Sequence, residues 1–198
     1  MPIRVVNADG ETIFESHAAK SLTDALALAA AAGTPLRAAN LRNEALNGVQ
    51  APGLDLSHAD LLCAQLRGAS LPGANFTFAN LNRADLEGAD LSGAEFPGAV
   101  LRNANMAKAN LRKADLRNAA LAEVNLEGAD LSGADLRNAD LRGLNFNLMD
   151  MNATLITGAE RRSGPRREKP ADYRMLFSGI ERRRKDRRDS NSSQSGAP

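Results

Sequence analysis

Residues 84–143 read ADLEG ADLSG AEFPG AVLRN ANMAK ANLRK ADLRN AALAE VNLEG ADLSG ADLRN ADLRG, so the chain repeats with a period of five residues. The apolar residue in the middle of each unit, here called the centre, recurs at every fifth position from Leu36 to Ile156, which makes 25 units. Leu, Phe or Met fills every centre except Ala51 and Ile156. In most units Ala lies two positions before the centre and Asp or Asn lies directly before it.

A period of five fits neither of the common regular structures. In an α-helix five residues turn the chain by about 500°, which would scatter the centres over every face. In a flat strand the odd period would send alternate centres to opposite faces. All centres can point inward only if the chain bends once per unit, and the frequent Gly residues stand where a turn can demand a positive φ. These glycines are Gly68, Gly73, Gly88, Gly93, Gly98, Gly128, Gly133 and Gly143. The pattern therefore predicts a solenoid with stacked Leu and Ala inside.

The units resemble those of the pentapeptide repeat family, whose pattern A(D/N)LXX is met by Ala84-Asp85-Leu86, Ala129-Asp130-Leu131 and many others. The resemblance covers about residues 34–158. It implies a mainly β fold, a right-handed four-sided parallel β-helix with four units, and hence 20 residues, in each coil.

A 20-residue coil makes the register testable. Phe76 and Phe96 should stack one coil apart, and Leu116 and Leu136 should continue their column. Small Ala at the other inward position, from Ala59 to Ala139, keeps the interior narrow. Larger or charged residues replace this Ala near both ends of the repeat, where we expect end coils that meet caps. They are Glu44, Val49 and Leu54 at the start, and Leu144 and Met149 at the end.

The segments outside the repeat predict a cap at each end. Residues 3–6 and 12–15 read as a β-hairpin around a turn, and Ser21 with Asp24 predicts the start of a helix over 22–32. We expect residues 1–33 to cap the β-helix of 34–158, and a separate small domain is the alternative. Residues 159–188 read as a linker followed by a helix, and 189–198 as a disordered tail.

Composition and charge narrow the class of protein. Only 4% of the 198 residues are aromatic, and one cysteine excludes a disulfide framework. No apolar run approaches the length of a membrane span, and the N-terminus lacks a signal-peptide pattern, so we expect a soluble, cytoplasmic protein. Counting charged side chains gives −2 for residues 1–33, −3 for 34–158 and +6 for 159–198.

No group of residues predicts catalysis. His17 lies in the expected cap, while His58 and Cys63 take the same position in adjacent units and so lie on different faces. That arrangement suits no nucleophile–base pair, and phosphate-binding and metal-ligand motifs are missing. We therefore expect a non-enzymatic protein without cofactor or metal, which binds a macromolecular partner or acts as a scaffold.

The resemblance implies one specific partner. The family includes bacterial quinolone-resistance proteins that bind DNA gyrase and topoisomerase IV by resembling duplex DNA in size and charge. Two columns of acidic residues could serve this role here, and they are Asp90, Asp130 and Asp150 in one column and Glu95, Asp115 and Asp135 in the other. Arg117 and Arg137 should lie close enough to cancel much of that charge, and the charges of the β-helix could equally serve solvation alone.

Two features of the C-terminal region suggest roles of their own. Met175, Leu176, Phe177 and Ile180 form a short apolar cluster that could cap the last coil or join two copies into a homodimer. A basic run could hold nucleic acid or an anionic surface, and it comprises Arg182, Arg183, Arg184, Lys185, Arg187 and Arg188. For the protein as a whole, a structural role within a larger assembly, such as a phage particle, is a third possible function.

Overall fold

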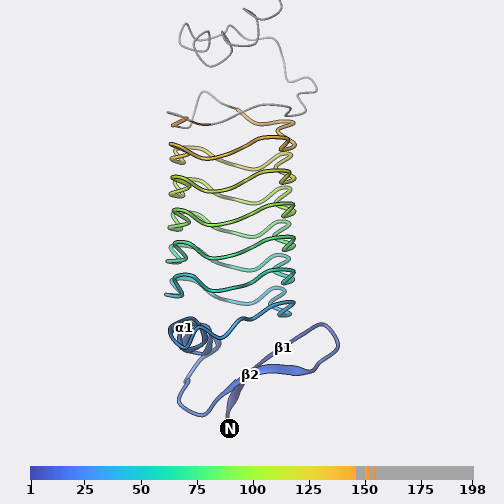
Figure 1. The fold of residues 1–198 in the computed structure, drawn as a ribbon, viewed down its shortest axis with the longest axis vertical. Coiled ribbons are helices and arrows are strands. Elements are labelled where there is room, and N and C mark those ends of the chain that lie inside the picture. Colours follow the sequence, from blue (N-terminus) through green and yellow to red (C-terminus); the bar gives the residue numbers. More distant parts are fainter. Residues whose placement is uncertain (146–149, 152–153, 155–198) are drawn as a thin grey trace, which may run out of the picture. The chain divides into compact units, whose positions relative to one another are not determined.

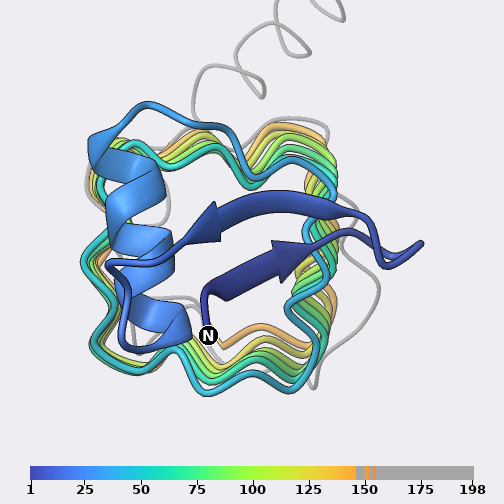
Figure 2. The same ribbon diagram turned by 90° about the horizontal axis from the view of Figure 1, so that it is seen from below.

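The computed structural model describes residues 1–145, 150, 151 and 154. From residue 36 onward the chain winds into stacked coils, which Figure 1 shows from the side. Every parallel β-bridge joins residues that are 20 apart, from Asn40↔Asp60 to Asp130↔Asp150. The predicted 20-residue coil is therefore confirmed. Seen along the stack, the coils have the four-sided outline of Figure 2.

Each unit ends in a tight turn that forms one corner of the coil. At the corner after Leu61, for example, the Ala64 amide donates to the Leu61 carbonyl at 3.0 Å, and Cys63 has a φ of 56°. A positive φ at the third residue and a negative one at the second define a type II turn, which favours Gly at that third position. Gly fills ten of these corners, yet Asn, Lys, Arg, Glu, Phe, His, Cys and Ala adopt the same conformation at the other twelve. The corner conformation is thus set by the coil and does not depend on Gly.

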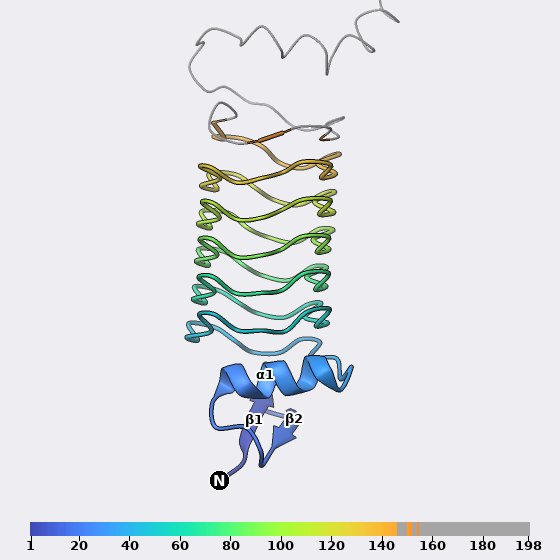
Figure 3. The same cartoon turned by 90° about the vertical axis from the view of Figure 1, so that its left-hand side faces the viewer.

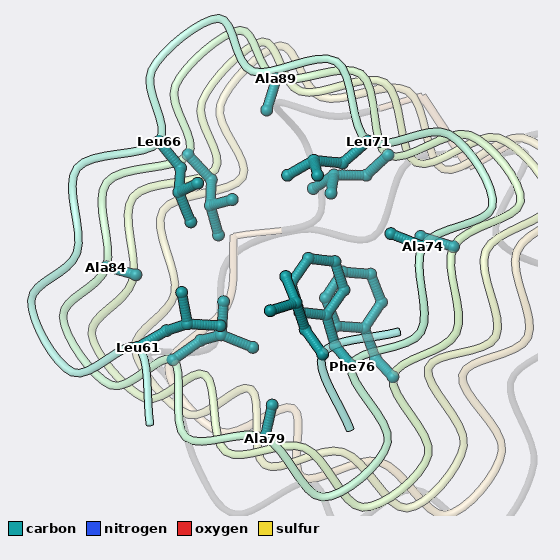
Figure 4. Close-up of a cluster of buried hydrophobic side chains, with 14 of the residues drawn as sticks. Leu61, Leu66, Leu71, Ala74, Phe76, Ala79, Ala84 and Ala89 are labelled. Carbon is teal, nitrogen blue, oxygen red and sulfur yellow. The ribbon is translucent and has the colours of Figure 1, made fainter. Parts of the chain in front are cut away.

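The centres and their partner alanines fill the interior. Phe76, Leu81 and Ala79 are fully buried, as are nearly all their equivalents between Leu36 and Leu141. Figure 4 shows Leu61, Leu66, Leu71 and Phe76 pointing inward from the four sides of a coil. Phe76 and Phe96 stack with ring centroids 4.9 Å apart and planes inclined by 5°, as the register predicts. Such a ring pair adds about 0.5–1.5 kcal/mol to the stability gained by burial alone.

Ahead of the coils lies a hairpin of β1 (Ile3–Val6) and β2 (Thr12–Ser16), followed by helix α1 (Leu22–Ala31). Ser21 begins the helix: its hydroxyl accepts from the Asp24 amide, and the Asp24 carboxylate accepts from the Lys20 amide at 3.0 Å. Gly33 follows the helix with a φ of 63°. In this Schellman motif the Thr34 amide donates to the Ala29 carbonyl at 2.8 Å.

Helix and hairpin cover the first coil (Figure 3). Ala25, Leu26 and Ala29 of α1 are buried in the same hydrophobic cluster as the first centres. The hairpin supplies hydrogen bonds, because the Val6 carbonyl accepts from the Asn40 amide at 2.8 Å. The backbone groups that a bare solenoid end would expose are therefore partly paired here.

One inward position of the first coil departs from the prediction. Val49 and Leu54 are buried, but Glu44, which has the same place in its unit, is exposed. A carboxylate is too costly to bury without a partner, so this corner of the first coil opens to solvent. At the other end Leu144 is partly buried against the core, and Met149 lies outside the described residues.

Candidate partner-binding surface

Where Asp or Asn precedes a centre, it stabilises the corner turn that follows. Its side-chain oxygen accepts a hydrogen bond from the backbone amide two residues later, inside the corner turn. Asp90 accepts from the Ser92 amide at 3.1 Å, and Asp130 accepts from the Ser132 amide at 2.9 Å. The recurrence of Asp and Asn at this position therefore follows from turn formation before any binding role is considered.

The first predicted acidic column is present in the structure. Bridges align Asp90, Asn110, Asp130 and Asp150 in successive coils. Within it the Asn110 amide group donates to Asp90 Oδ1 at 2.9 Å, and Arg112 Nη1 lies 3.1 Å from Asp130 Oδ2. The hydrogen bonds of Ser132 are the main reason that the pKa of Asp130 lies below its usual value, with Arg112 a further cause. Neighbouring side chains thus already form hydrogen bonds or ion pairs with the carboxylates of Asp90 and Asp130.

Arginines compensate the second predicted column, in which Glu95, Asp115 and Asp135 are aligned. Arg117 Nη2 lies 2.6 Å from Asp115 Oδ2, and Arg137 forms the equivalent pair with Asp135. These arginine hydrogen bonds are the largest cause holding the pKa of both aspartates below the usual value, against the opposing effect of partial burial. Glu95 is exposed and has no ion pair with any described residue.

The ring of His58 and the thiol of Cys63 have separate surroundings. His58 and Cys63 occupy successive corners with φ values of 59° and 56°. His58 stacks on Phe78 with ring centroids 5.4 Å apart, and Cys63 is a free, partly buried thiol. In the part of the chain that the structure describes, no group of three or more His, Cys, Asp or Glu side chains could hold a metal ion.

Two features were missed at the level of sequence. Phe78 stands at a corner position where Gly and Asn predominate, and its side chain is 60% exposed. Arg83 and Arg102 meet at another corner, where neither forms an ion pair with a described residue. The sequence did contain a signal for the first feature, because Phe78, Val100 and Ala120 depart from the residue types usual at their positions in the repeat. The predicted apolar cluster at 175–180 and the basic run at 182–188 lie outside the described residues.

These observations define a class of protein: a β-helix whose interior is filled with side chains, so that its described coils present their outer surface to other molecules. The sequence matches the family model described as pentapeptide repeats, in 8 copies over residues 53–88, 84–121 and 119–158. These ranges span more than half of the chain, and the protein therefore belongs to the pentapeptide repeat family, whose fold is a right-handed β-helix.

Solved structures of other family members are similar to this chain. A pentapeptide repeat protein from Nostoc PCC 7120 is 33% identical over 52% of this chain and 84% of its own, with a TM-score of 0.42. One from the Arabidopsis thaliana thylakoid lumen is 30% identical over 59% of this chain and 72% of its own, with a TM-score of 0.36. QnrB1, a plasmid-mediated fluoroquinolone resistance protein, is 18% identical over 72% of this chain and 83% of its own, with a TM-score of 0.27.

No curated protein matches the sequence. Within the described residues, no helix combines the length and the apolar character that crossing a membrane requires.

Proposed function

We propose that this protein is a non-enzymatic interaction module that binds a protein partner through the outer surface of its coils. The closed interior is the observation that carries this proposal. The inward side chains between Leu56 and Leu121 are almost completely buried, so the coils offer only their outside for recognition. A rigid stack of coils presents side chains at fixed spacing, which favours recognition of an extended partner surface.

Mimicry of DNA toward gyrase or topoisomerase IV is a second candidate, favoured by family membership and by the two acidic columns. The charge distribution opposes it. A protein site built for phosphates attracts a clearly negative surface, whereas residues 34–158 carry a net charge of only −3. The pairs of Arg112, Arg117 and Arg137 with aspartates reduce the field of both columns further. We therefore place this candidate behind a different protein partner.

The charge of +6 over residues 159–198 favours a third candidate, in which the basic run binds nucleic acid or an anionic surface. This activity would depend steeply on salt concentration, because binding releases counterions. It would also be independent of the coil surface.

One set of variants separates the three candidates. Full-length protein on a resin is incubated with a bacterial lysate, beside a variant in which Arg182, Arg183 and Arg184 are replaced by Gln. We expect a partner that both proteins retain in the presence of nuclease and that substitutions on one coil face release. Retention lost with the Gln variant would favour the basic run. Inhibition or protection of purified gyrase in a supercoiling assay would favour mimicry. A partner that no surface substitution releases would contradict the proposal.

A further inference from the structure

One face of the β-helix interrupts the polar pattern of the surface. We call it the Val100 face, and it comprises residues 79–83, 99–103 and 119–123 in three successive coils. Of the outward positions directly before the centres between residues 40 and 145, only Ala45, Val100 and Ala120 are apolar. Val100 bridges to Asn80 on one side and to Ala120 on the other, so the two apolar residues lie together.

An exposed aromatic ring borders this face. Phe78 precedes Asn80 by two residues, at the corner where the chain enters the Val100 face. Its ring extends over the next coil, because a methyl group at Gly98 would lie only 2.5 Å from Phe78 Cε1. On its other side the ring stacks against His58. The ring is therefore held in place along the edge of the face although 60% of Phe78 is exposed.

Two arginines without ion pairs border the opposite edge. The described residues contain ten arginines, and eight of them form ion pairs, namely Arg4, Arg37, Arg42, Arg67, Arg112, Arg117, Arg137 and Arg142. The remaining two, Arg83 and Arg102, are exposed and adjacent, since the Arg83 amide donates to the Arg102 carbonyl at 3.0 Å. Neither guanidinium group forms an ion pair with a described residue. The pKa of Asp140 lies below its usual value mainly through its hydrogen bonds with Arg142, and Arg102 adds a weaker charge interaction.

The other charged side chains on and beside the face indicate which charge a ligand should carry. Asp60 and Asp140, in the coils on either side, are paired with Arg42 and Arg142. Glu123, one coil beyond Arg102, is a carboxylate without an ion pair to any described residue. Arg83, Arg102 and Arg142 outnumber Asp140 and Glu123, so this edge of the face carries a net positive charge beside the apolar Val100 and Ala120.

We propose that the Val100 face binds a protein segment that places an apolar side chain against Phe78 and Val100 and a carboxylate against Arg83 and Arg102. This inference rests on the proposed protein-binding function and assigns it to one face. Exposed apolar surface rimmed by polar groups marks interaction sites, and Arg binds carboxylates in a bidentate manner. A nucleic acid fits less well, because two arginines beside Glu123 offer little to a repeated phosphate backbone.

The test uses a phage-displayed library of short random peptides, selected on the full-length protein. We expect the enriched peptides to carry an aromatic or aliphatic residue close to Asp or Glu. Their affinity, measured by fluorescence anisotropy, should fall at least about tenfold with Phe78→Ser and with Arg102→Glu. Lys113→Glu makes a similar charge change at the opposite corner of the coil and should leave affinity within about twofold.

Several outcomes would overturn the assignment. The first is that no peptide is enriched, and the second is that the enriched peptides bind Phe78→Ser and Arg102→Glu as well as they bind the parent protein. The third tests a nucleic acid as the ligand: oligothymidylate would bind tightly, and the peptides would not displace it. Peptides whose binding is lost only with Lys113→Glu would overturn the Val100 face yet leave the proposed protein-binding function standing. Circular dichroism melting of each variant shows that the coils are intact.

Discussion

At the scale of the residue, every corner turn requires a positive φ at its third position, and the fold tolerates residues other than Gly there. A left-handed conformation costs a residue with a Cβ roughly 1–2 kcal/mol relative to its preferred regions. Lys113 adopts it with a φ of 58°, while Gly93 holds the same position one coil earlier. The coil imposes the conformation through its backbone hydrogen bonds, such as that from the Lys113 amide to the Ser132 carbonyl at 3.0 Å.

Lys113→Gly should therefore stabilise the protein, by up to about 1 kcal/mol, because it removes the strain of a side chain at positive φ. Ser92 directly precedes Gly93, the equivalent of Lys113 one coil earlier, and it does not have a positive φ. Ser92→Gly should instead lower stability by about 0.5–1 kcal/mol through the greater flexibility of the unfolded chain. Urea unfolding followed by circular dichroism measures both. Equal destabilisation by the two changes would show that the coil does not strain Lys113.

At the scale of the element, neighbouring positions in one unit differ entirely in environment. Leu111 is fully buried, and Arg112 directly after it is exposed and paired with Asp130. We expect Leu111→Arg to cost at least about 4 kcal/mol and to abolish folding, because a charge would enter a narrow apolar column. Leu131→Lys should behave in the same way. Thermal melting of the purified variants measures this.

Arg112→Ala is the matched control and should change stability by no more than about 0.5–1 kcal/mol, since an exposed ion pair contributes little. If Leu111→Arg melted as Arg112→Ala does, the inward direction of the centres would be wrong.

The ion pairs along the coils give stability a defined dependence on pH. Hydrogen bonds from Arg117, Arg137 and Arg142 are the main cause of the lowered pKa of Asp115, Asp135 and Asp140. A carboxyl group whose pKa is lower in the folded state stabilises the protein above its unfolded pKa, and the contribution disappears as pH falls through the folded value. The free energy of unfolding should therefore decrease below about pH 4.

Replacing Asp115 and Asp135 together by Asn should make that decrease shallower, as measured by urea unfolding at a series of pH values. Arg83→Gln removes an arginine without an ion pair and should leave the slope unchanged. An equally steep decrease in the Asn variant would show that Asp115 and Asp135 do not cause the pH dependence of stability.

At the scale of the whole molecule, we expect the N-terminal segment, which covers the first coil, to protect that coil from self-association. Leu26 of α1 is buried against the core, whereas Leu28 on the same helix is 40% exposed. Leu26→Glu should release α1 and uncover the end of the coils, whose unpaired backbone groups can join a second copy. We expect oligomers whose size increases with concentration in light scattering. Leu28→Glu introduces the same charge and should leave the oligomeric state unchanged, and identical behaviour of the two variants would contradict a protective role.

The five-residue period was enough to predict a chain that bends once per unit and buries its centres, because an inward side chain every fifth residue fits neither a helix nor a flat strand. The four units per coil came from the resemblance to pentapeptide repeats, and the 20-residue register and the stacking of Phe76 on Phe96 follow from that number. The positions of Arg117 and Arg137, two residues after Asp115 and Asp135, were enough to expect those two pairs. Pairs between coils, and the arginines that form none, were decided by the tertiary structure. Arg112 reaches Asp130, which lies 18 residues away in the chain and in the next coil. Arg83 and Arg102 form no ion pair within the described part of the chain, and Phe78 can lie across its neighbour only because Gly98 leaves room. A local repeat determines the interior, but contacts between coils determine the surface that other molecules meet.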